Sequence, residues 1–475
     1  MLLNRTRELN YLDRRYARSG AEFVVLYGRR RVGKSALIYE WSRDKPALYF
    51  FSARLPEHVL LKEFSQQIAQ ALNQPERTFP DWTSAFVALA ELVHSDKFQG
   101  EKFIVIIDEY PYLADSVPGL STVLQRAWDT TLQHTNLFLC LTGSAHSVMR
   151  REIFHDKAPL YRRHTWAYEL QPLQPSDYGH FFPTYTSEEI IESYAVLGGM
   201  PRNLMTGNRR GPLMRNIANE LLDPAGGLFN EVPLLLNEEL KGEVDVFSRV
   251  LETIAAGAHT RQAIASATQA TLAATQHYLD DLQAIGAVEH RRPLNRVQSQ
   301  KRKGTYHILD PFLRFWHRWV APHHRLLEIS QRQKETLDEI RRNLPYIVAP
   351  VWEEIARRHL LLASGLGKIP FPVQEIGSWW VRDARIDVVG VNRLNHQVIF
   401  GEVRWRATNV TTKDLEILME KALLWLKGDT ARWEVHYAFF AKSFGQMALD
   451  DIEAEQVHLF TPEDITATYS TSNPL

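Results

Sequence analysis

The chain has almost no cysteine, no long apolar run and almost no net charge. Cys140 is the single cysteine among 475 residues, which excludes an intrachain disulfide and a cysteine-based zinc site. Because it lies in an apolar run, we expect it to be inert core. No apolar stretch approaches the roughly 18 residues of a membrane span, and the first residues lack the apolar segment of a signal peptide. We therefore expect a cytoplasmic protein without a membrane partner.

The formal net charge of −1 does not indicate any class of partner. Only local clusters of charge can therefore indicate what the protein binds. Apolar residues make up 45% of the chain and charged residues 23%, which is ordinary for a globular protein. A chain of this length is too long for one hydrophobic core. We therefore expect several domains.

One stretch, GRRRVGKS, fits the pattern G-x-x-x-x-G-K-[ST] at every fixed position. It follows the apolar run Phe23–Tyr27 and precedes the helix-like run Ala36–Trp41, which is the context that a phosphate-binding P-loop needs. Backbone N–H groups and the positive end of the helix dipole would hold the phosphates. We expect ATP and Mg²⁺ here, with Lys34 on the β- and γ-phosphates and Ser35 on the metal. The expected nucleotide contacts are Gly28, Arg29, Arg30, Arg31, Val32, Gly33, Lys34, Ser35 and Ala36.

The apolar run Phe103–Ile107 ends in Asp108 and Glu109. A central parallel strand places its C-terminal residues beside the P-loop. We therefore expect Asp108 to hold the Mg²⁺ shell and Glu109 to orient and deprotonate an attacking water. The alternative is a pair of acids that caps the next turn.

Another strand-like run, Leu137–Leu141, ends in two hydroxyl side chains, Thr142 and Ser144. Either hydroxyl could contact the γ-phosphate or hold the water, and the sequence does not choose between them or exclude a plain turn. Ala47–Ser52 is expected to be a second buried strand. Strands that alternate with helices predict a parallel sheet with helices on both faces, an α/β fold. The expected helices are 5–18, 57–72 and 82–94.

Residues 241–322 have the pattern of a winged helix. Three helical runs precede two short strands, Ala287–His290 and Thr305–Ile308, with Gly286 expected to end the last helix. The loop between the strands carries six basic residues and no acidic one, which favours contact with a phosphate backbone. Asp280 and Asp281 on the expected recognition helix oppose DNA, so a solvated hairpin is the alternative. The helical runs are 246–256, 261–267 and 272–285.

Pro345 and Pro350 are expected to mark a hinge into the last domain. Within that domain, Asp387 and the pair Glu402 and Arg404 lie on two expected strands, and alternate residues of a strand point the same way. Two carboxylates could hold a metal that activates water. Arginine at 404 can clamp phosphate but cannot act as a base. Cleavage of nucleic acid, binding without cleavage and a structural salt bridge all remain open.

Five stretches together resemble one family. Tyr27–Ser35, Ile107–Tyr110, Leu141–Ser144, Pro159–Arg163 and Gly198–Pro201 are similar, in this order, to prokaryotic AAA-superfamily ATPases that are often grouped with the STAND NTPases. The resemblance implies four parts: an ATPase core (1–170), a helical lid (171–240), a winged helix (241–322) and a domain similar to restriction endonucleases (323–475).

The same resemblance assigns further residues. Arg163 is a candidate arginine finger, although Arg162 stands where the family usually has glycine, so either could act. Pro201 is expected to pack near the adenine. Asp387, Glu402 and Arg404 resemble a D…E-x-K nuclease site that has lost its lysine, and Arg385 stands where the family usually has glutamate.

These observations predict an ATPase that acts as a nucleotide-controlled switch on its C-terminal modules. One alternative is an ATP-gated DNA endonuclease, and the other is a non-catalytic scaffold that retains nucleotide. DNA, a protein partner and a homo-oligomer are all compatible with the sequence.

Overall fold

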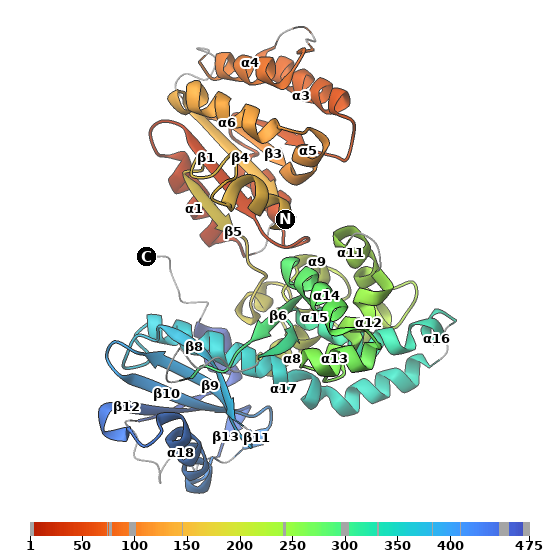
Figure 1. The fold of residues 1–475 in the computed structure, drawn as a ribbon. Coiled ribbons are helices and arrows are strands. Elements are labelled where there is room, and N and C mark those ends of the chain that lie inside the picture. The colour runs from red at the N-terminus through yellow and green to blue at the C-terminus, as the bar shows by residue number, and fades with distance from the viewer. Residues whose placement is uncertain are drawn as a thin grey trace. The chain divides into compact units, whose positions relative to one another are not determined.

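The computed structural model describes residues 4–468 except for 74, 76, 77, 95–100, 145, 241–243, 296–303, 330, 331, 382, 409 and 446–455. The chain forms two compact units (Figure 1). The first consists of Met1–Pro172 with Met200–Arg202, and the second of Leu173–Gly199 with Asn203–Leu475.

The first unit is built on a five-stranded sheet with the order β2-β3-β4-β1-β5. Every neighbouring pair is parallel, so the expected parallel α/β sheet is confirmed. Strand β4 separates β1 from β3, which brings three strand ends to one edge of the sheet. The strands are β1 (Glu22–Tyr27), β2 (Ala47–Phe51), β3 (Phe103–Asp108), β4 (Leu137–Gly143) and β5 (Trp166–Glu169). The helices are α1 (Thr6–Tyr16), α2 (Lys34–Ser42), α3 (Glu57–Leu72), α4 (Trp82–His94), α5 (Tyr110–Ser116), α6 (Leu120–Thr130) and α7 (His146–Met149).

Helices cover both faces of this sheet. On one face, Leu12 of α1 and Trp41 of α2 pack with Val24 and Ile106. The larger core on the other face joins side chains of α3, α4, α5 and α6 to alternate residues of the same strands. Cys140 is fully buried in the first of these cores, where burial raises the pKa of its thiol. It is inert core, as expected.

Strand β2 differs from its expected place in the sheet. It lies at the edge and its residues alternate between exposed and covered, with Phe51 53% exposed. A run of aromatic and apolar residues predicts a buried strand. At the edge of a sheet, however, such a strand has a neighbour on one side only, so part of its surface stays exposed. The strand's position matters because it brings Tyr49 beside β3.

The second unit begins with helices and ends in a separate sheet. The first helices are α8 (Ser187–Leu197), α9 (Pro201–Met205), α10 (Leu213–Asn216) and α11 (Glu231–Glu239). Helix α9 starts in the part of the chain that belongs to the first unit. Thr186 caps α8 and forms a reciprocal capping box with Glu189, which fixes where the helix begins.

Three helices and a hairpin follow. Helices α12 (Val244–Ala255), α13 (Arg261–Thr268) and α14 (Leu272–Ala284) precede the antiparallel strands β6 (Val288–Arg291) and β7 (Thr305–Ile308). Gly286 after α14 has a φ of 69°, a left-handed conformation that suits glycine at a helix end. Asp310 then caps α15 (Pro311–Phe315) through its Oδ1, which accepts from the N–H of Phe312.

Helix α16 (His324–Glu328) leads to α17 (Gln333–Gly365), which contains Pro345 and Pro350. The expected hinge at these prolines is therefore wrong. A proline inside a helix costs about 3 kcal/mol, but side chains on both sides of Pro350, such as Val348 and Trp352, are buried. Their packing holds one continuous helix across both positions.

The C-terminal sheet has the strand order β14-β12-β10-β9-β8. Strands β8, β9 and β10 are antiparallel, whereas β10, β12 and β14 are parallel. Gly390 of β9 lies against Leu360 of α17, and the neighbouring Val389 packs with Leu418 of α18, so these helices cover opposite faces. The remaining elements are β8 (Glu375–Val381), β9 (Ala384–Asn392), β10 (Gln397–Val403), β11 (Ala407–Thr408), α18 (Thr412–Leu426), β12 (Glu434–Phe440), β13 (Ser443–Phe444), β14 (Val457–Phe460) and α19 (Pro462–Thr468).

Candidate functional site

The glycine-rich loop between β1 and α2 has the backbone geometry of a phosphate cradle. Gly28 has a φ of 143°, and a Cβ added to it would lie 2.6 Å from the carbonyl oxygen of Leu170. Gly33 has a φ of 100° and lies directly before α2. Both positions require glycine, because a side chain would clash at the first and strain the backbone at the second. The loop therefore presents backbone N–H groups at a helix N-terminus, which favours anions.

Lys34 is folded over this loop. Its Nζ donates to the carbonyl oxygens of Gly28 at 2.9 Å and Arg29 at 3.1 Å. Arg5 also supports the loop, because it is buried and its Nη2 donates to the carbonyl of Val32 at 2.9 Å. It was not among the residues expected to contact the nucleotide.

Asp108, at the end of β3, is fully buried. Thr142 on β4 donates to its Oδ1, and Tyr49 on β2 donates to its Oδ2. Burial, followed by the Asp108 carboxylate, raises the pKa of Tyr49, so the phenol stays a donor, although a hydrogen bond with Ser35 opposes this shift. Tyr49 thus contacts both residues that were expected at the magnesium ion. The sequence did not predict a role for Tyr49. The only feature that could have indicated one was its hydroxyl group within a strand-like apolar run.

Glu109 follows in a left-handed conformation, with a φ of 54°. Its carboxylate accepts from the hydroxyl of Ser144, at 3.1 Å to Oε2. Arg30 of the glycine-rich loop donates to the same hydroxyl at 3.4 Å. Both hydroxyls at the end of β4 are therefore engaged, Thr142 with Asp108 and Ser144 with Glu109. The ends of β3 and β4 and the glycine-rich loop are therefore joined through Ser144, which contacts both Glu109 and Arg30.

Pro201 lies in the same unit, with its Cγ 3.8 Å from where a Cβ on Gly33 would stand. Arg163 lies at the other edge of the sheet. Arg163 lies just before β5. Two residues later, the N–H of Thr165 donates to the carbonyl oxygen of Phe23 at the start of β1. Its guanidinium is held by both carboxylate oxygens of Asp129, at 3.3 and 3.1 Å. Arg163 is therefore directed away from the glycine-rich loop of its own chain.

Among the expected nuclease-like residues of the second unit, Asp387 is paired with an arginine. The Nε of Arg385 donates to Oδ1 of Asp387 at 3.0 Å, and its Nη2 pairs with Glu353 of α17. Burial raises the pKa of Asp387 to about 6, and Glu353 adds to the shift. Within the described residues, no group of three or more His, Cys, Asp or Glu side chains is placed to hold a metal ion.

Glu402 and Arg404 form only a loose pair, at 3.7 Å. Strand β10 ends at Val403, so Arg404 lies just beyond the strand on which it was expected. Glu402 lies closer to Lys421 of α18, at 3.0 Å, and Arg404 closer to Asp414, at 2.8 Å. Lys421 is a cation that the sequence did not reveal, because it is distant in the chain.

Part of the basic loop between β6 and β7 lies outside the described residues, namely Arg296 and 301–303. Arg291 is paired with Glu289 and, at 3.2 Å, with Glu354 of α17. Burial alone would raise the pKa of Glu354, but Arg358 and Arg291 outweigh it and lower the pKa. Arg292 is exposed.

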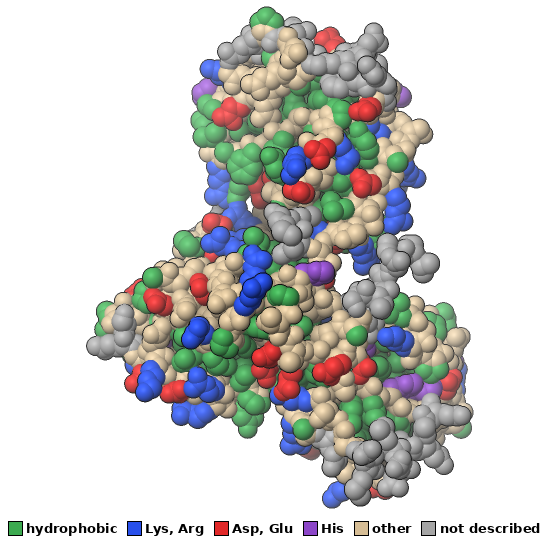
Figure 2. Space-filling model, turned by 180° about the vertical axis from the view of Figure 1, so that it is seen from behind, with side chains coloured by type: hydrophobic (Ala, Val, Ile, Leu, Met, Phe, Trp, Pro, Cys, Tyr) green, Lys and Arg blue, Asp and Glu red, His purple; other side chains and the backbone are tan. Residues whose placement is uncertain are grey.

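On the face drawn in Figure 2, basic and acidic side chains are interspersed. None of the described helices has the length and apolar character that crossing a membrane requires.

Comparisons with known proteins agree with this arrangement. Residues 2–206 match a family described as "ATPase domain predominantly from Archaea", and residues 316–416 match one described as "Archaea bacterial proteins of unknown function". An uncharacterized protein of Methanocaldococcus jannaschii, MJECL04, is 29% identical over 86% of this chain and 88% of its own.

Two further similarities are a short stretch of sequence and a solved fold. An uncharacterized ATP-binding protein of the same organism, MJ0423, is 44% identical over 45 residues, which are 10% of this chain and 76% of that protein. The solved Walker-type ATPase PABY2304 of Pyrococcus abyssi is similar with a TM-score of 0.50 and 20% identity, over 66% of this chain and 96% of that one. At this identity, the likeness shows the fold alone.

Proposed function

We propose, starting from the match of residues 2–206 to the family of ATPase domains found mainly in Archaea, that this chain hydrolyses ATP with Mg²⁺. The observation that carries the proposal is the convergence of Lys34, Asp108 and Glu109 at one edge of the sheet. Lys34 exchanges its loop carbonyls for the β- and γ-phosphates. Ser35 and Asp108 hold the magnesium ion, which neutralises phosphate charge.

Glu109 acts as the group that orients and deprotonates the attacking water. Ser144 keeps the carboxylate in place through its hydrogen bond, and Arg30 ties Ser144 to the loop that holds the phosphates. The γ-phosphate would therefore be linked to the base through Arg30 and Ser144. The ends of the sheet strands, not mobile side chains, set this geometry.

The second unit is the element that the nucleotide state controls in this proposal. Its three helices and hairpin form a winged helix, and its C-terminal sheet, with α17 and α18 on opposite faces, is similar to a restriction-endonuclease domain. Pro201 lies beside Gly33 in the first unit, while Asn203–Met205 of the same helix α9 belong to the second unit. Helix α9 is therefore one covalent connection through which the nucleotide reaches the second unit. The chain acts in the cytoplasm, on DNA or on a protein partner.

The endonuclease alternative is weaker, because the two carboxylates that a catalytic metal would need are already paired with cations, Asp387 with Arg385 and Glu402 with Lys421. It predicts Mg²⁺-dependent cleavage that is lost in Asp387→Ala. The scaffold alternative predicts bound ADP after purification and no turnover.

The experiment is ATP hydrolysis by the wild type, Lys34→Ala and Glu109→Gln, each with and without duplex DNA at low salt. Matched controls are Lys62→Ala on α3 and Glu40→Gln on α2, which change exposed side chains of the same unit. We expect Glu109→Gln to bind ATP but to lose turnover by a factor of about 10² to 10⁴. Normal hydrolysis by Lys34→Ala would falsify the assignment. Acceleration by DNA would make the second unit a nucleic-acid sensor, and its absence would favour a protein partner.

A further inference from the structure

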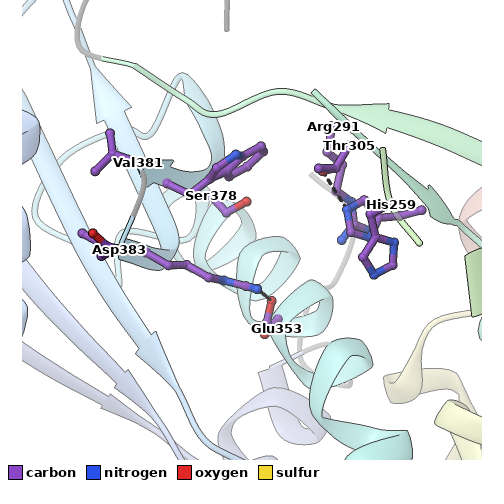
Figure 3. A pocket seen from close by; sticks show the side chains of 11 residues that line it. His259, Arg291, Thr305, Glu353, Ser378, Val381 and Asp383 are labelled. Carbon is purple, nitrogen blue, oxygen red and sulfur yellow. Dashed lines mark hydrogen bonds and ion pairs between the residues drawn. The ribbon is translucent and has the colours of Figure 1, made fainter. Parts of the chain in front are cut away.

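A cavity lies entirely within the second unit, and none of the residues assigned to ATP lines it. It has a volume of about 720 Å³ and is lined by the hairpin β6–β7, by α17 and by strands β8 and β9. Figure 3 shows Ser378 and Asp383 on one side and Arg291, Thr305 and His259 on the other. Ligand sites in proteins commonly have volumes of about 300–1,000 Å³, so a molecule of nucleotide size fits.

The walls carry aromatic rings that stay uncharged at neutral pH. Trp380 lines the cavity and is only partly buried, whereas its neighbour Trp379 is packed in the core on the other face of β8. The imidazoles of His259 and His307 are stacked, with ring centroids 4.3 Å apart. Burial lowers the pKa of His307 to about 2 and also lowers that of His259. These rings offer flat surfaces for stacking and neutral hydrogen-bonding atoms.

Two arginines of the lining are held rigidly by carboxylates. Arg385 is paired with Glu353 and Asp387, and Arg291 with Glu289 and Glu354. These contacts use Nε and Nη2 of each guanidinium, and no described residue pairs with either Nη1. A guanidinium whose orientation is already set loses little freedom when it binds phosphate. Arg385 is also paired in register with Trp380 across β8 and β9, so a stacking surface and a phosphate donor lie side by side.

The charges around the cavity limit which anion it accepts. Both arginines are largely neutralised by their carboxylate partners, and Asp383 adds negative charge to the lining. Such a lining disfavours a triphosphate but can hold one phosphate through directed hydrogen bonds. The preferred ligand therefore differs from that of the glycine-rich loop.

We propose that this cavity binds a nucleoside monophosphate unit, with its base against Trp380 and its phosphate on Nη1 of Arg385 and Arg291. The unit comes from a free mononucleotide or from an unstacked nucleotide of a single strand. A ligand here contacts the hairpin, α17 and the C-terminal sheet at once. It would therefore join the elements that the proposed switch rearranges, but its binding does not depend on ATP hydrolysis.

The test is isothermal titration of the full chain with adenosine monophosphate and, separately, with a four-residue oligothymidylate. Saturating Mg²⁺ and ADP keep the probes from the glycine-rich loop, and a repeat in Lys34→Ala separates this proposal from the ATPase assignment. Stacking of one base contributes about 1–3 kcal/mol, so we expect Trp380→Ala to weaken binding about fivefold or more. Trp380→Phe should retain most of it.

Arg385→Gln removes a phosphate donor and should also weaken binding, whereas Arg432→Gln, at an exposed position outside the cavity, should not. Binding of the mononucleotide identifies a free nucleotide as the ligand, and binding of the oligonucleotide alone identifies a single strand. The proposal is overturned if neither probe binds, or if both Trp380→Ala and Arg385→Gln bind like the wild type. Melting curves of each variant distinguish lost binding from lost folding.

Discussion

Tyr49 on β2 donates its phenolic hydroxyl to Oδ2 of Asp108 on β3, and Thr142 donates to Oδ1 of the same carboxylate. Both oxygens of this buried acid are therefore satisfied by protein groups. A magnesium shell held by Asp108 has to share or replace one of these contacts. Because Ser35 also influences the pKa of this phenol, Tyr49 is the side chain through which the two expected metal-binding residues affect each other.

The first prediction concerns Tyr49→Phe. This change leaves Oδ2 of a buried carboxylate without its donor, and a hydrogen bond to a charged group contributes about 1.5–3 kcal/mol. We expect a lower melting temperature without nucleotide, and a smaller difference from the wild type with Mg²⁺ and ATP, since the metal shell takes over the oxygen. Tyr39→Phe is the control, because Tyr39 is 58% exposed and its ring contacts Tyr49. Equal melting temperatures without nucleotide would show that the hydrogen bond contributes nothing.

The second prediction concerns Gly28→Ala. The new Cβ would lie 2.6 Å from the carbonyl oxygen of Leu170, so the glycine-rich loop has to move. We expect ATP affinity to fall about tenfold or more, equivalent to at least about 1.4 kcal/mol, as measured by titration with ATP. Gly20→Ala is the control, because Gly20 also has a positive φ, of 76°, but has no atom within 4 Å of the added Cβ. If Gly28→Ala and Gly20→Ala have the same affinity for ATP, any loss of affinity comes from backbone strain at a positive φ and not from the clash with Leu170.

The third prediction uses the place of Arg163 at the edge of the sheet opposite the loop. An arginine there can reach a γ-phosphate only in a neighbouring chain. We expect Arg163→Ala to lose hydrolysis by a factor of about 10³ or more. Mixing it with the inactive Lys34→Ala should restore part of the rate, because each variant supplies what the other lacks. No recovery on mixing would exclude this role in an oligomer, and Arg162→Ala tests the neighbouring candidate in the same way.

The fourth prediction concerns pH. His359 of α17 is 1% exposed, and neither ring nitrogen has a partner among the described residues. Burial lowers its pKa from 6.5 to about 4. The stability due to its neutral form is therefore complete above about pH 6.5 and is lost as the pH falls to about 4, because the unfolded chain binds the proton first.

A shift of this size corresponds to about 3 kcal/mol across that window. We expect His359→Leu to lose less stability than the wild type between pH 6.5 and 4 in denaturant unfolding. His277→Leu changes a side chain that is 72% exposed and should keep the wild-type pH profile. Parallel profiles for His359→Leu and the wild type would contradict the prediction.

Local patterns of residues determined much of this protein by themselves. Helices at 57–72 and 82–94, as well as the strand at 305–308, lie where the sequence patterns placed them. The glycine-rich loop and the acids after Phe103–Ile107 were also readable, because their chemistry depends on residues close together in the chain. The parallel direction of the strands in the first sheet also followed from alternating strands and helices.

Only the tertiary structure decided which distant groups meet. Tyr49 reaches Asp108 because β2 pairs with β3, and Arg385 reaches Glu353 because α17 packs on β9. The same packing carries α17 through Pro345 and Pro350, against the local preference of proline. Sequence patterns report local preference and burial, whereas the partner of a charged or polar side chain depends on strand order and helix placement, which no local pattern contains.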